Sequence, residues 1–417
     1  MSPVKKIPVK DFMKFADIVV NAYPGMGMSS TPEDLKKMKE RLARVEKDDP
    51  RIRHYGVYRR NQLLGGMRLY DFDMTLFDRA IPVGGVGLVA VDLNHKKEHV
   101  CKEMIEYFHQ HYLKKGACMT TLYPFRPDFY RKMGYGYGVK LSHYRIKPAD
   151  LPGGKAKKNI HYLSSKDFPA MTECYDRYAA ATHGMMRRVN TEFAAFERRH
   201  FRMIGYKRGK KLLGYTAFSF KKLKQDNFIL NDIVIEELIY ENREAFLEMI
   251  SFFHNQADQI NAIIFDLLDD SFHFLPHDPR IGNDNIIAPV YHESNTQGVG
   301  LMYRVIDIKK LFTVLKNHDF GGQNLKLKLT VRDSLLPQNA GSYILHFADG
   351  KPSLKKKAAT DVEIEIDIAD FSSLIMGCVD FRSLYDYGLV EIGDEKYLDA
   401  VNRLFLVERK PICWSQF

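Results

Sequence analysis

The spacing of apolar residues predicts alternating helices and strands in the first third of the chain. Apolar side chains at positions 100, 104, 105, 108 and 112 recur with helical spacing, which predicts a helix over 100–113. Thr31 and Pro32 open a segment rich in Lys and Glu, which predicts an exposed, capped helix over 32–47. Shorter patterns predict strands at 53–60, 63–70, 83–91, 118–123 and 144–146, and a short helix at 127–133.

The middle third repeats this order of elements after a boundary. Residues 148–158 are rich in Pro, Gly and Lys, which marks a linker. Beyond it, the pattern predicts helices at 167–181, 190–202 and 241–257 and strands at 211–220, 228–235 and 261–266. The order echoes the first third without a repeat at the level of residues, so we predict a weakly duplicated α/β domain.

Two strands of opposite charge give the last third a different character. Over 325–332, Leu and Val alternate with Lys, Thr and Arg, and over 362–368, Val and Ile alternate with Glu and Asp. This alternation predicts two half-buried strands whose charges pair across their solvent face. Residues 343–347, followed by Asp349-Gly350, predict a hairpin, and helices are expected at 369–376 and 394–406. We therefore predict a distinct α+β domain.

The composition excludes several classes of protein. The 417 residues are 45% apolar and 27% charged, as in globular proteins and unlike disordered or fibrous ones. The five cysteines include no CxxC pair, which argues against a disulfide scaffold and a thiolate zinc site. The sequence shows neither the apolar stretch of a signal peptide nor a run of about 18 apolar residues that could cross a membrane. We expect a soluble, cytoplasmic protein with no membrane partner.

The net charge of +10 suits anionic partners of several kinds. The lysine clusters, at 155–158, 207–211, 221–224 and 355–357, are scattered and lack interleaved aromatic residues. Solvated faces are therefore expected, and no nucleic-acid partner. Nucleic-acid binding stays an alternative that rests on the charge alone.

Two motifs are set aside on structural grounds. Gly85-Val-Gly87-Leu-Val-Ala90 fits G-x-G-x-x-A, but its glycines precede the apolar strand instead of following it, so no dinucleotide site is expected. His273 and His277 could ligate a metal ion together with Asp278, but Pro276 breaks the helix that would align the two histidines. We predict a polar loop there and no metal site.

A basic loop between a strand and a helix is the most informative feature. Strand 88–91 leads into residues 92–99, which include Lys96 and Lys97, and the helix that starts at Val100 follows. Free backbone N–H groups and the dipole at a helix N-terminus attract anions. A pyrophosphate would fit this loop.

This loop and a second motif, Phe129-Tyr130-Arg131-Lys132-Met133-Gly134-Tyr135-Gly136, resemble a known cofactor site. Residues 84–138 resemble the acetyl-CoA core of the GNAT superfamily of N-acetyltransferases, and more narrowly the enhanced intracellular survival (Eis) family. That family joins two GNAT folds to a sterol-carrier-protein-like domain and ends in an aromatic residue, as in Cys413-Trp414-Ser-Gln-Phe417. The resemblance implies an α/β (α+β) fold with GNAT-like domains at 1–147 and 148–296 and a sterol-carrier-protein-like domain at 297–417.

The resemblance also implies roles for single residues. The backbone of Val89, Ala90 and Val91 would bind the pantetheine arm of acetyl-CoA, Tyr130 would be the general acid, and the α-carboxylate of Phe417 the general base. Further cofactor contacts are implied at the helix start and past the next strand, at Lys97, Glu98, His99, Val100, Cys101, Lys102, Phe125 and Arg126. The rivals of Tyr130 for its role are Tyr123, Tyr135 and Tyr137.

The pyrophosphate loop departs from the family pattern. Where the family typically reads Arg-Arg-Arg-Gly-Leu, this chain reads Lys96-Lys97-Glu98-His99-Val100. His99 replaces a glycine that favours close approach to a phosphate, and Glu98 adds a negative charge. We expect weakened rather than abolished binding of the cofactor.

The function that follows from the resemblance is transfer of an acetyl group from acetyl-CoA to a primary amine. The acceptor would be a cationic small molecule or side chain, with aminoglycosides, polyamines and lysine as suggested classes. The resemblance also implies a homo-oligomer, a hexamer. The alternative is a non-catalytic protein that binds a lipid or another small molecule on a degenerate GNAT scaffold, because the last domain resembles sterol carrier proteins.

Overall fold

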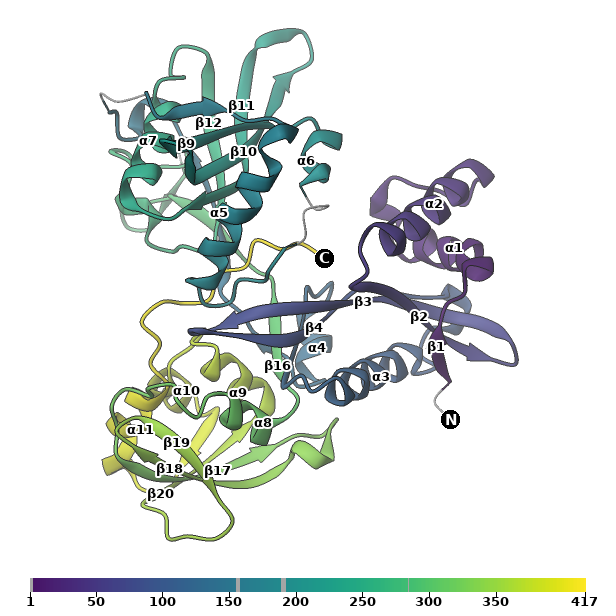
Figure 1. Ribbon diagram of the computed structural model, residues 1–417, viewed down its shortest axis with the longest axis vertical. Coiled ribbons are helices and arrows are strands. Elements are labelled where there is room, and N and C mark those ends of the chain that lie inside the picture. Colours follow the sequence, from purple (N-terminus) through teal and green to yellow (C-terminus); the bar gives the residue numbers. More distant parts are fainter. Residues whose placement is uncertain (1–2, 155–157, 189–192, 284) are drawn as a thin grey trace. The chain divides into compact units, whose positions relative to one another are not determined.

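The computed structural model describes residues 3–154, 158–188, 193–283 and 285–417 (Figure 1). The chain divides into two compact units. The first consists of Met1–Gly138, Leu301–Pro411 and Ser415–Phe417, and the second of Val139–Gly300 and Ile412–Trp414. Most of the lysine cluster at 155–158, and with it part of the predicted linker, lies outside the described residues.

Seven strands of the first unit form a mixed sheet, in the order β1-β2-β3-β4-β5-β16-β6. All its neighbours pair antiparallel except β4 and β5, which are parallel. Its strands are β1 (Val4–Lys6), β2 (Ile52–Arg59), β3 (Gln62–Leu76), β4 (Arg79–Val91), β5 (Met119–Leu122), β6 (Gly136–Tyr137) and β16 (Met302–Val305).

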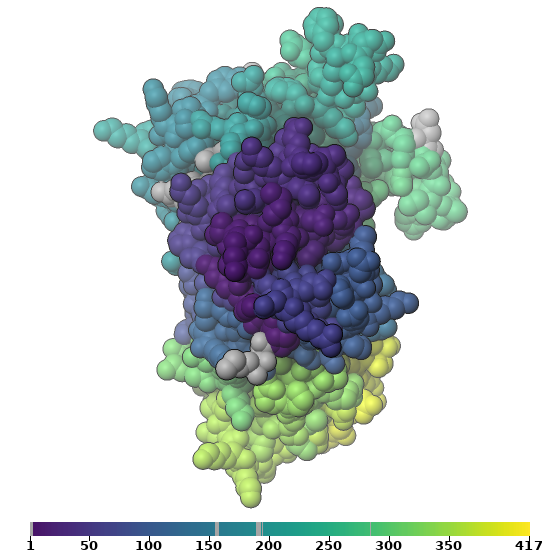
Figure 2. Space-filling model, turned by 90° about the vertical axis from the view of Figure 1, so that its right-hand side faces the viewer, coloured from purple at the N-terminus to yellow at the C-terminus, as the bar shows by residue number. Residues whose placement is uncertain are grey.

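Helices cover both faces of this sheet (Figure 1). α1 (Phe12–Ala22) packs on one face together with α2 (Pro32–Asp48), and the two form a continuous surface in Figure 2. α3 (Val100–Lys114) packs on the other face, and the short α4 (Pro127–Arg131) follows β5. The Thr31 side chain accepts a hydrogen bond from the N–H of Asp34, which confirms the predicted cap of α2.

The second unit repeats this layout around another seven-stranded sheet, in the order β15-β7-β12-β11-β10-β9-β8. Its strands are β7 (Lys140–Ile146), β8 (Ile160–Tyr162), β9 (Arg202–Arg208), β10 (Lys211–Lys224), β11 (Asn227–Tyr240), β12 (Ile260–Leu267) and β15 (Asn295–Val299). β11 and β12 form the parallel pair. α5 (Phe168–Ala180) and α7 (Arg243–His254) pack on opposite faces, and a small ladder joins β13 (Ile286–Ile287) to β14 (Tyr291–His292). The predicted duplication is therefore present at the level of topology.

One strand of each sheet comes from a distant part of the chain. β7 follows β6 in sequence but joins the second sheet, beside β12. The place next to β5 in the first sheet is filled by β16, which follows all strands of the second sheet. The predicted domain boundaries after residues 147 and 296 stay predictions.

The helix predicted at 190–202 is too long. Its start lies partly outside the described residues, and the helix observed there is α6 (Ala194–Arg198), with β9 beginning at Arg202. His200, between them, has a φ of +56°. Because this left-handed conformation cannot continue a right-handed helix, the chain leaves α6 and enters the sheet.

The C-terminal part of the first unit is a five-stranded sheet in the order β19-β18-β17-β20-β21. Its strands are β17 (Leu325–Arg332), β18 (Gly341–Ala348), β19 (Lys351–Lys355), β20 (Val362–Asp367) and β21 (Val390–Ile392). Its helices are α8 (Ile308–Val314), α9 (Ile368–Ile375), α10 (Phe381–Asp386) and α11 (Leu398–Phe405). Together with the two mixed sheets, this domain confirms the predicted α/β (α+β) class.

The charge pairing predicted for this sheet is present. Lys328 Nζ lies 2.8 Å from Glu363, and Arg332 lies 2.5 Å from Glu365. The predicted hairpin is also confirmed, because Asp349 and Gly350 join β18 to β19 with positive φ angles. No helix of the described residues has both the length and the apolar character needed to cross a membrane.

A buried ion pair joins β16 to the segment after β17. Both oxygens of Asp333 accept hydrogen bonds from Arg304 Nη2, at 2.7 and 2.8 Å, and both side chains are 0% exposed. Arg304 Nη1 also donates to the carbonyl of Met133, and Asn339 donates to Asp333. These contacts hold together β16, the segment before β6 and the segment after β17.

We predict that Asp333→Ala lowers the free energy of unfolding by about 3–5 kcal/mol, because it leaves the Arg304 charge buried without its partner. Equilibrium unfolding in urea measures the loss. Glu365→Gln, which breaks the exposed pair with Arg332, is the control and costs about 1 kcal/mol or less. Equal losses in the two variants would show that the buried pair does not stabilise the fold.

Candidate active site

A β-bulge in β4 sets the geometry of the site. Gly66 pairs with Ala90 and Arg68 with Gly87, so that Met67 alone faces two residues of β4, Leu88 and Val89. The positive φ of Leu88, +49°, marks the same place. A bulge of this kind bends its strand and interrupts the pairing.

Beyond the bulge, β4 continues past the end of β5, its neighbour on the side away from β3. The parallel pairing with β5 ends at Val86 and Leu122. In the described chain, residues 87–91 therefore have no strand partner on that side. Val89, Ala90 and Val91, predicted to bind the pantetheine arm, lie on this open edge.

A tyrosine that the sequence analysis missed already uses one group of this edge. Tyr23, directly after α1, donates a hydrogen bond from its hydroxyl to the carbonyl of Val89 at 2.7 Å. Burial, and secondly the nearby Cys101, raises the pKa of Tyr23 to about 12, so the hydroxyl stays a donor. The only sequence signal was an aromatic residue before Pro24-Gly25 at the end of a helix.

The basic loop has the form of an anion site. Residues 92–99 curl back into α3, with φ angles of +67° at Lys97 and +60° at His99, which is the N-cap residue. Lys96, Lys97 and His99 are exposed at the start of this helix of 15 residues. His99 thus occupies the position where the Eis family typically has glycine, and it adopts the left-handed conformation that glycine favours.

The negative charge of Glu98 is compensated within the loop. Arg59 lies 3.0 Å from one carboxylate oxygen and His95 lies 3.1 Å from the other. Arg59 also pairs with Glu103. Because Glu98 has these partners, its charge is offset at the site where a phosphate would bind.

Tyr130 is buried with an unoccupied hydroxyl. The residue is 2% exposed and packs edge-on against the rings of Phe129 and Tyr135, at 5.3 and 6.0 Å between centroids. Among the described residues its hydroxyl has no hydrogen-bond partner. Burial raises its pKa above the ordinary value, and Cys101 and Tyr23 raise it further. Cys101, in the first turn of α3, packs against the hydrophobic cluster that contains Tyr130.

Of the remaining predicted cofactor contacts, Val100 is buried and Cys101 half-buried, whereas Lys102, Phe125 and Arg126 are exposed. Phe125 packs against Tyr130 with its ring largely in solvent. The Arg126 guanidinium is held by Asp128 at 2.5 Å, and Lys102 by Glu106 at 3.7 Å, both on the surface.

The C-terminal residue lies on β4. The ring of Phe417 packs among those of Tyr70, Phe72 and Tyr123, at 4.9–5.3 Å between centroids. A Cβ at Gly87 would lie 2.9 Å from the carboxyl carbon of Phe417, so this strand position must be glycine for the carboxylate to sit there. Within the described chain, the carboxylate has no ion-pair partner.

The second sheet keeps the bulge but lacks the anion loop. Glu236 is the extra residue of β11, opposite the bond between Ala217 and Phe218. α7 begins almost directly after β11, and its N-terminus is capped by Asn242, which accepts from the N–H of Ala245. The adjacent Glu241 binds Arg177. A helix start with an acidic neighbour and a side-chain cap does not favour a phosphate.

The two motifs set aside in the sequence have other roles. Gly85 and Gly87 lie inside β4, where Phe72 and Phe417 pack against them. His273 lies in a short turn of helix, and its ring contacts Phe274. Across the described residues, no three His, Cys, Asp or Glu side chains gather as they would around a metal ion.

Family models match three parts of the chain. An acetyltransferase (GNAT) domain matches residues 4–138, a second acetyltransferase (GNAT) domain matches residues 184–305, and a sterol carrier protein domain matches residues 313–414. A search among curated proteins found no match.

Solved structures share the fold over the whole chain. A probable N-acyltransferase from Enterococcus faecalis V583 is 20% identical, with a TM-score of 0.79 and 99% of each chain covered. A GCN5-related N-acetyltransferase from Anabaena variabilis is 19% identical, with a TM-score of 0.80 and the same coverage. Eis1 from Mycobacterium abscessus is 16% identical, with a TM-score of 0.78 and 99% of this chain and 100% of that one covered.

At these identities the solved structures establish the fold, and the domain matches establish the class of enzyme. They confirm the predicted order of two GNAT-like domains and a sterol-carrier-protein-like domain. The chain is an acetyltransferase built of two GNAT domains and a sterol carrier protein domain.

Proposed function

We propose that the first domain transfers an acetyl group from acetyl-CoA to the primary amine of a cationic acceptor, in the manner of the Eis family. One observation carries the proposal. The open edge of β4, the anion loop at the start of α3 and the unoccupied hydroxyl of Tyr130 converge on one place. Each supplies a different requirement of the reaction.

The residues present fit acetyl-CoA. The main-chain groups of Val89, Ala90 and Val91 that point away from β3 are available to an extended amide-containing arm, except for the Val89 carbonyl, which Tyr23 occupies. The N–H groups at the start of α3, with Lys96 and Lys97, suit a pyrophosphate. The remaining contacts of the proposal are Glu98, His99, Val100, Cys101, Lys102, Phe125 and Arg126. When bound, the cofactor supplies an acetyl thioester whose leaving group is a thiolate.

Tyr130 is the proposed general acid. Its raised pKa keeps the phenol protonated at neutral and mildly alkaline pH, which is the state needed to protonate a departing thiolate. Because its hydroxyl donates to no described protein group, the proton is available to the substrate. Its rivals are less suited: Tyr123 donates to the carbonyl of Ser415, the Tyr135 hydroxyl is shared with His109 and Thr120, and Tyr137 is part-exposed.

The α-carboxylate of Phe417 is the proposed general base. A primary amine has a pKa near 10 and enters as an ammonium ion, which an unpaired carboxylate attracts and deprotonates directly or through water. The N–C bond then forms as the C–S bond breaks. The nitrogen loses two protons in all, the thiolate takes one from Tyr130, and the net release is one proton to solvent.

The acceptor and the assembly belong to the same proposal. The Eis resemblance suggests an aminoglycoside, a polyamine or a lysine side chain as the amine, and a cytoplasmic homohexamer. The unpaired carboxylate of Phe417 supports a cationic acceptor. The alternative of a lipid-binding protein gains no specific support, because the inner face of the C-terminal sheet is filled by packed rings of Phe320, Phe347, Phe371 and Phe405.

We predict that the wild-type protein binds one acetyl-CoA per chain and releases CoA when an amine is added. In Tyr130→Phe, turnover falls at least about 100-fold because the thiolate loses its proton donor, while the dissociation constant for acetyl-CoA is unchanged. Calorimetric titration gives the binding, and a thiol reagent follows CoA release.

Tyr137→Phe is the matched control, since this neighbouring tyrosine is part-exposed, and it should turn over like the wild type. Wild-type turnover in Tyr130→Phe would exclude Tyr130 as the acid. Absence of acetyl-CoA binding by the wild type would exclude the whole proposal.

We predict that residues appended after Phe417 suppress turnover, because they replace the carboxylate by an amide. Gly87→Ala should act in the same direction, since its Cβ would displace the carboxyl carbon 2.9 Å away. The same extension at the N-terminus and Gly298→Ala, where a Cβ meets nothing within 4 Å, are the controls. Full turnover of the C-terminally extended protein would refute the base assignment.

We predict that His99→Gly raises the free energy of unfolding by about 1 kcal/mol, because glycine adopts a positive φ without strain. Acetyl-CoA affinity should stay equal or increase, since main-chain N–H groups bind the phosphates. His200→Gly, at a φ of +56° in the other unit, should stabilise similarly without affecting affinity. Lost affinity in His99→Gly would show that the imidazole itself binds the cofactor.

A further inference from the structure

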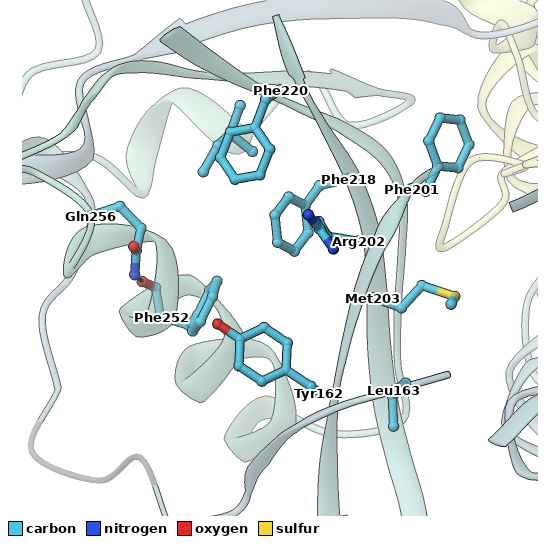
Figure 3. Close-up of a pocket in the computed structure, with 10 residues that line it drawn as sticks. Tyr162, Leu163, Phe201, Arg202, Met203, Phe218, Phe220, Phe252 and Gln256 are labelled. Atoms are coloured by element: carbon cyan, nitrogen blue, oxygen red, sulfur yellow. Dashed lines mark hydrogen bonds between the residues drawn. The ribbon is translucent and has the colours of Figure 1, made fainter. Parts of the chain in front are cut away.

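The second unit contains an aromatic pocket that the acetyl transfer does not use. Its volume is about 580 Å³, within the usual range for small-molecule sites. The pocket lies between the sheet and the C-terminal end of α7, with Phe252 and Gln256 on its helix side (Figure 3). The proposed cofactor site lies at the N-terminal end of α3 in the first unit, whereas this pocket lies at the C-terminal end of α7 in the second, so the two sites are distinct.

Strand register explains why aromatic rings gather there. Phe218 and Phe220 are two residues apart on β10 and therefore face the same side of the sheet. Phe252 and Gln256 are four residues apart and share one side of α7 and its end. The ring of Phe218 lies 5.8 Å from that of Phe220 and 6.2 Å from that of Phe252, between centroids.

The pocket has a buried floor and an open rim. Phe218 is 3% exposed, whereas Phe220 and Tyr162 on the rim are 54% and 78% exposed. Figure 3 shows these rings around one space, and Arg202 reaches the same side of the sheet as Phe218, its cross-strand partner. A planar ring placed between them would contact several aromatic faces and cover the exposed ones.

The polar lining selects an anion. Arg202 pairs across the strands with Phe218, and no carboxylate lines the pocket. Arg208 in the same strand is bound by Glu244, whereas Arg202 has no acidic partner among the described residues. Gln256 donates to the carbonyl of Phe252 and leaves its amide oxygen for a ligand.

We propose that this pocket binds a small aromatic anion, a planar ring system carrying a carboxylate or sulfonate. The rings of Tyr162, Phe218, Phe220 and Phe252 hold the aromatic part, and Arg202 pairs with the charge. The site is independent of acetyl-CoA binding and of the chemistry at Tyr130.

Fluorescence titration of the full chain with 8-anilinonaphthalene-1-sulfonate tests the proposal. This probe should bind saturably, and Arg202→Gln and Tyr162→Ala should each weaken its affinity at least tenfold. N-phenyl-1-naphthylamine has the same rings without the sulfonate, so it should bind more weakly than the sulfonate, with an affinity that Arg202→Gln leaves unchanged. Saturating acetyl-CoA should not displace the sulfonate.

Two control variants match the changes. Phe274→Ala removes another exposed ring, 82% exposed, of the same unit, and Arg208→Gln removes the other β9 arginine. Neither should change the affinity. The proposal is wrong if Arg202→Gln binds the sulfonate like the wild type, or if the controls weaken binding equally. It is also wrong if Tyr162→Ala leaves the affinity for the sulfonate unchanged but lowers the mass of the assembly in light scattering. The surface around Tyr162 would then be an interface between copies of the chain.

Discussion

The bulge at Leu88 and Val89 is the constraint from which the rest of the candidate active site follows. Two residues of β4 opposite one of β3 turn the strand away from β5, so polar main-chain groups remain without a strand partner in the middle of a protein. Such groups need partners. Tyr23 satisfies one carbonyl, and the others stay available to an extended ligand. The candidate site thus consists mainly of strand groups that lack a ladder partner, next to the N-terminus of α3.

Glycines let other groups approach this strand closely. A Cβ at Gly84 would meet the ring of Tyr112 at 2.3 Å, one at Gly85 that of Phe72 at 2.4 Å, and one at Gly87 the carboxyl carbon of Phe417 at 2.9 Å. The glycines that resemble a dinucleotide motif therefore allow aromatic rings and the Phe417 carboxylate to pack closely against β4. The second sheet retains a bulge at Glu236, but buried polar side chains stand beside it. Glu237 there binds Arg188 at 2.6 Å and accepts from Tyr215.

Local chemistry made part of this molecule predictable. The start of α2 could be predicted from Thr31-Pro32, because a helix cap depends only on neighbouring residues. The Lys328–Glu363 pair could be predicted from the alternation of charge, because alternate residues of a strand face the same side of the sheet. The loop before α3 was also visible as basic residues between a strand and a helix. The position of Tyr23 was not, since it depends on how α1 packs over β4. The length of the helix near 194–198 was overestimated because nothing in the sequence marks a left-handed histidine.

The position of β16 has a consequence for how the protein is made. Residues Met119–Leu122 of β5 are buried and need a neighbour on their far edge, which β16 provides. A ribosome adds about 5–20 residues per second, so β16 emerges on the order of ten seconds or more after β5, and every strand of the second sheet emerges in between. During this interval the nascent first sheet has an open apolar edge, which is a template for pairing with other chains. Folding of the first GNAT domain is therefore completed late in synthesis, and the open edge of β5 is the part that chaperones would have to shield until then.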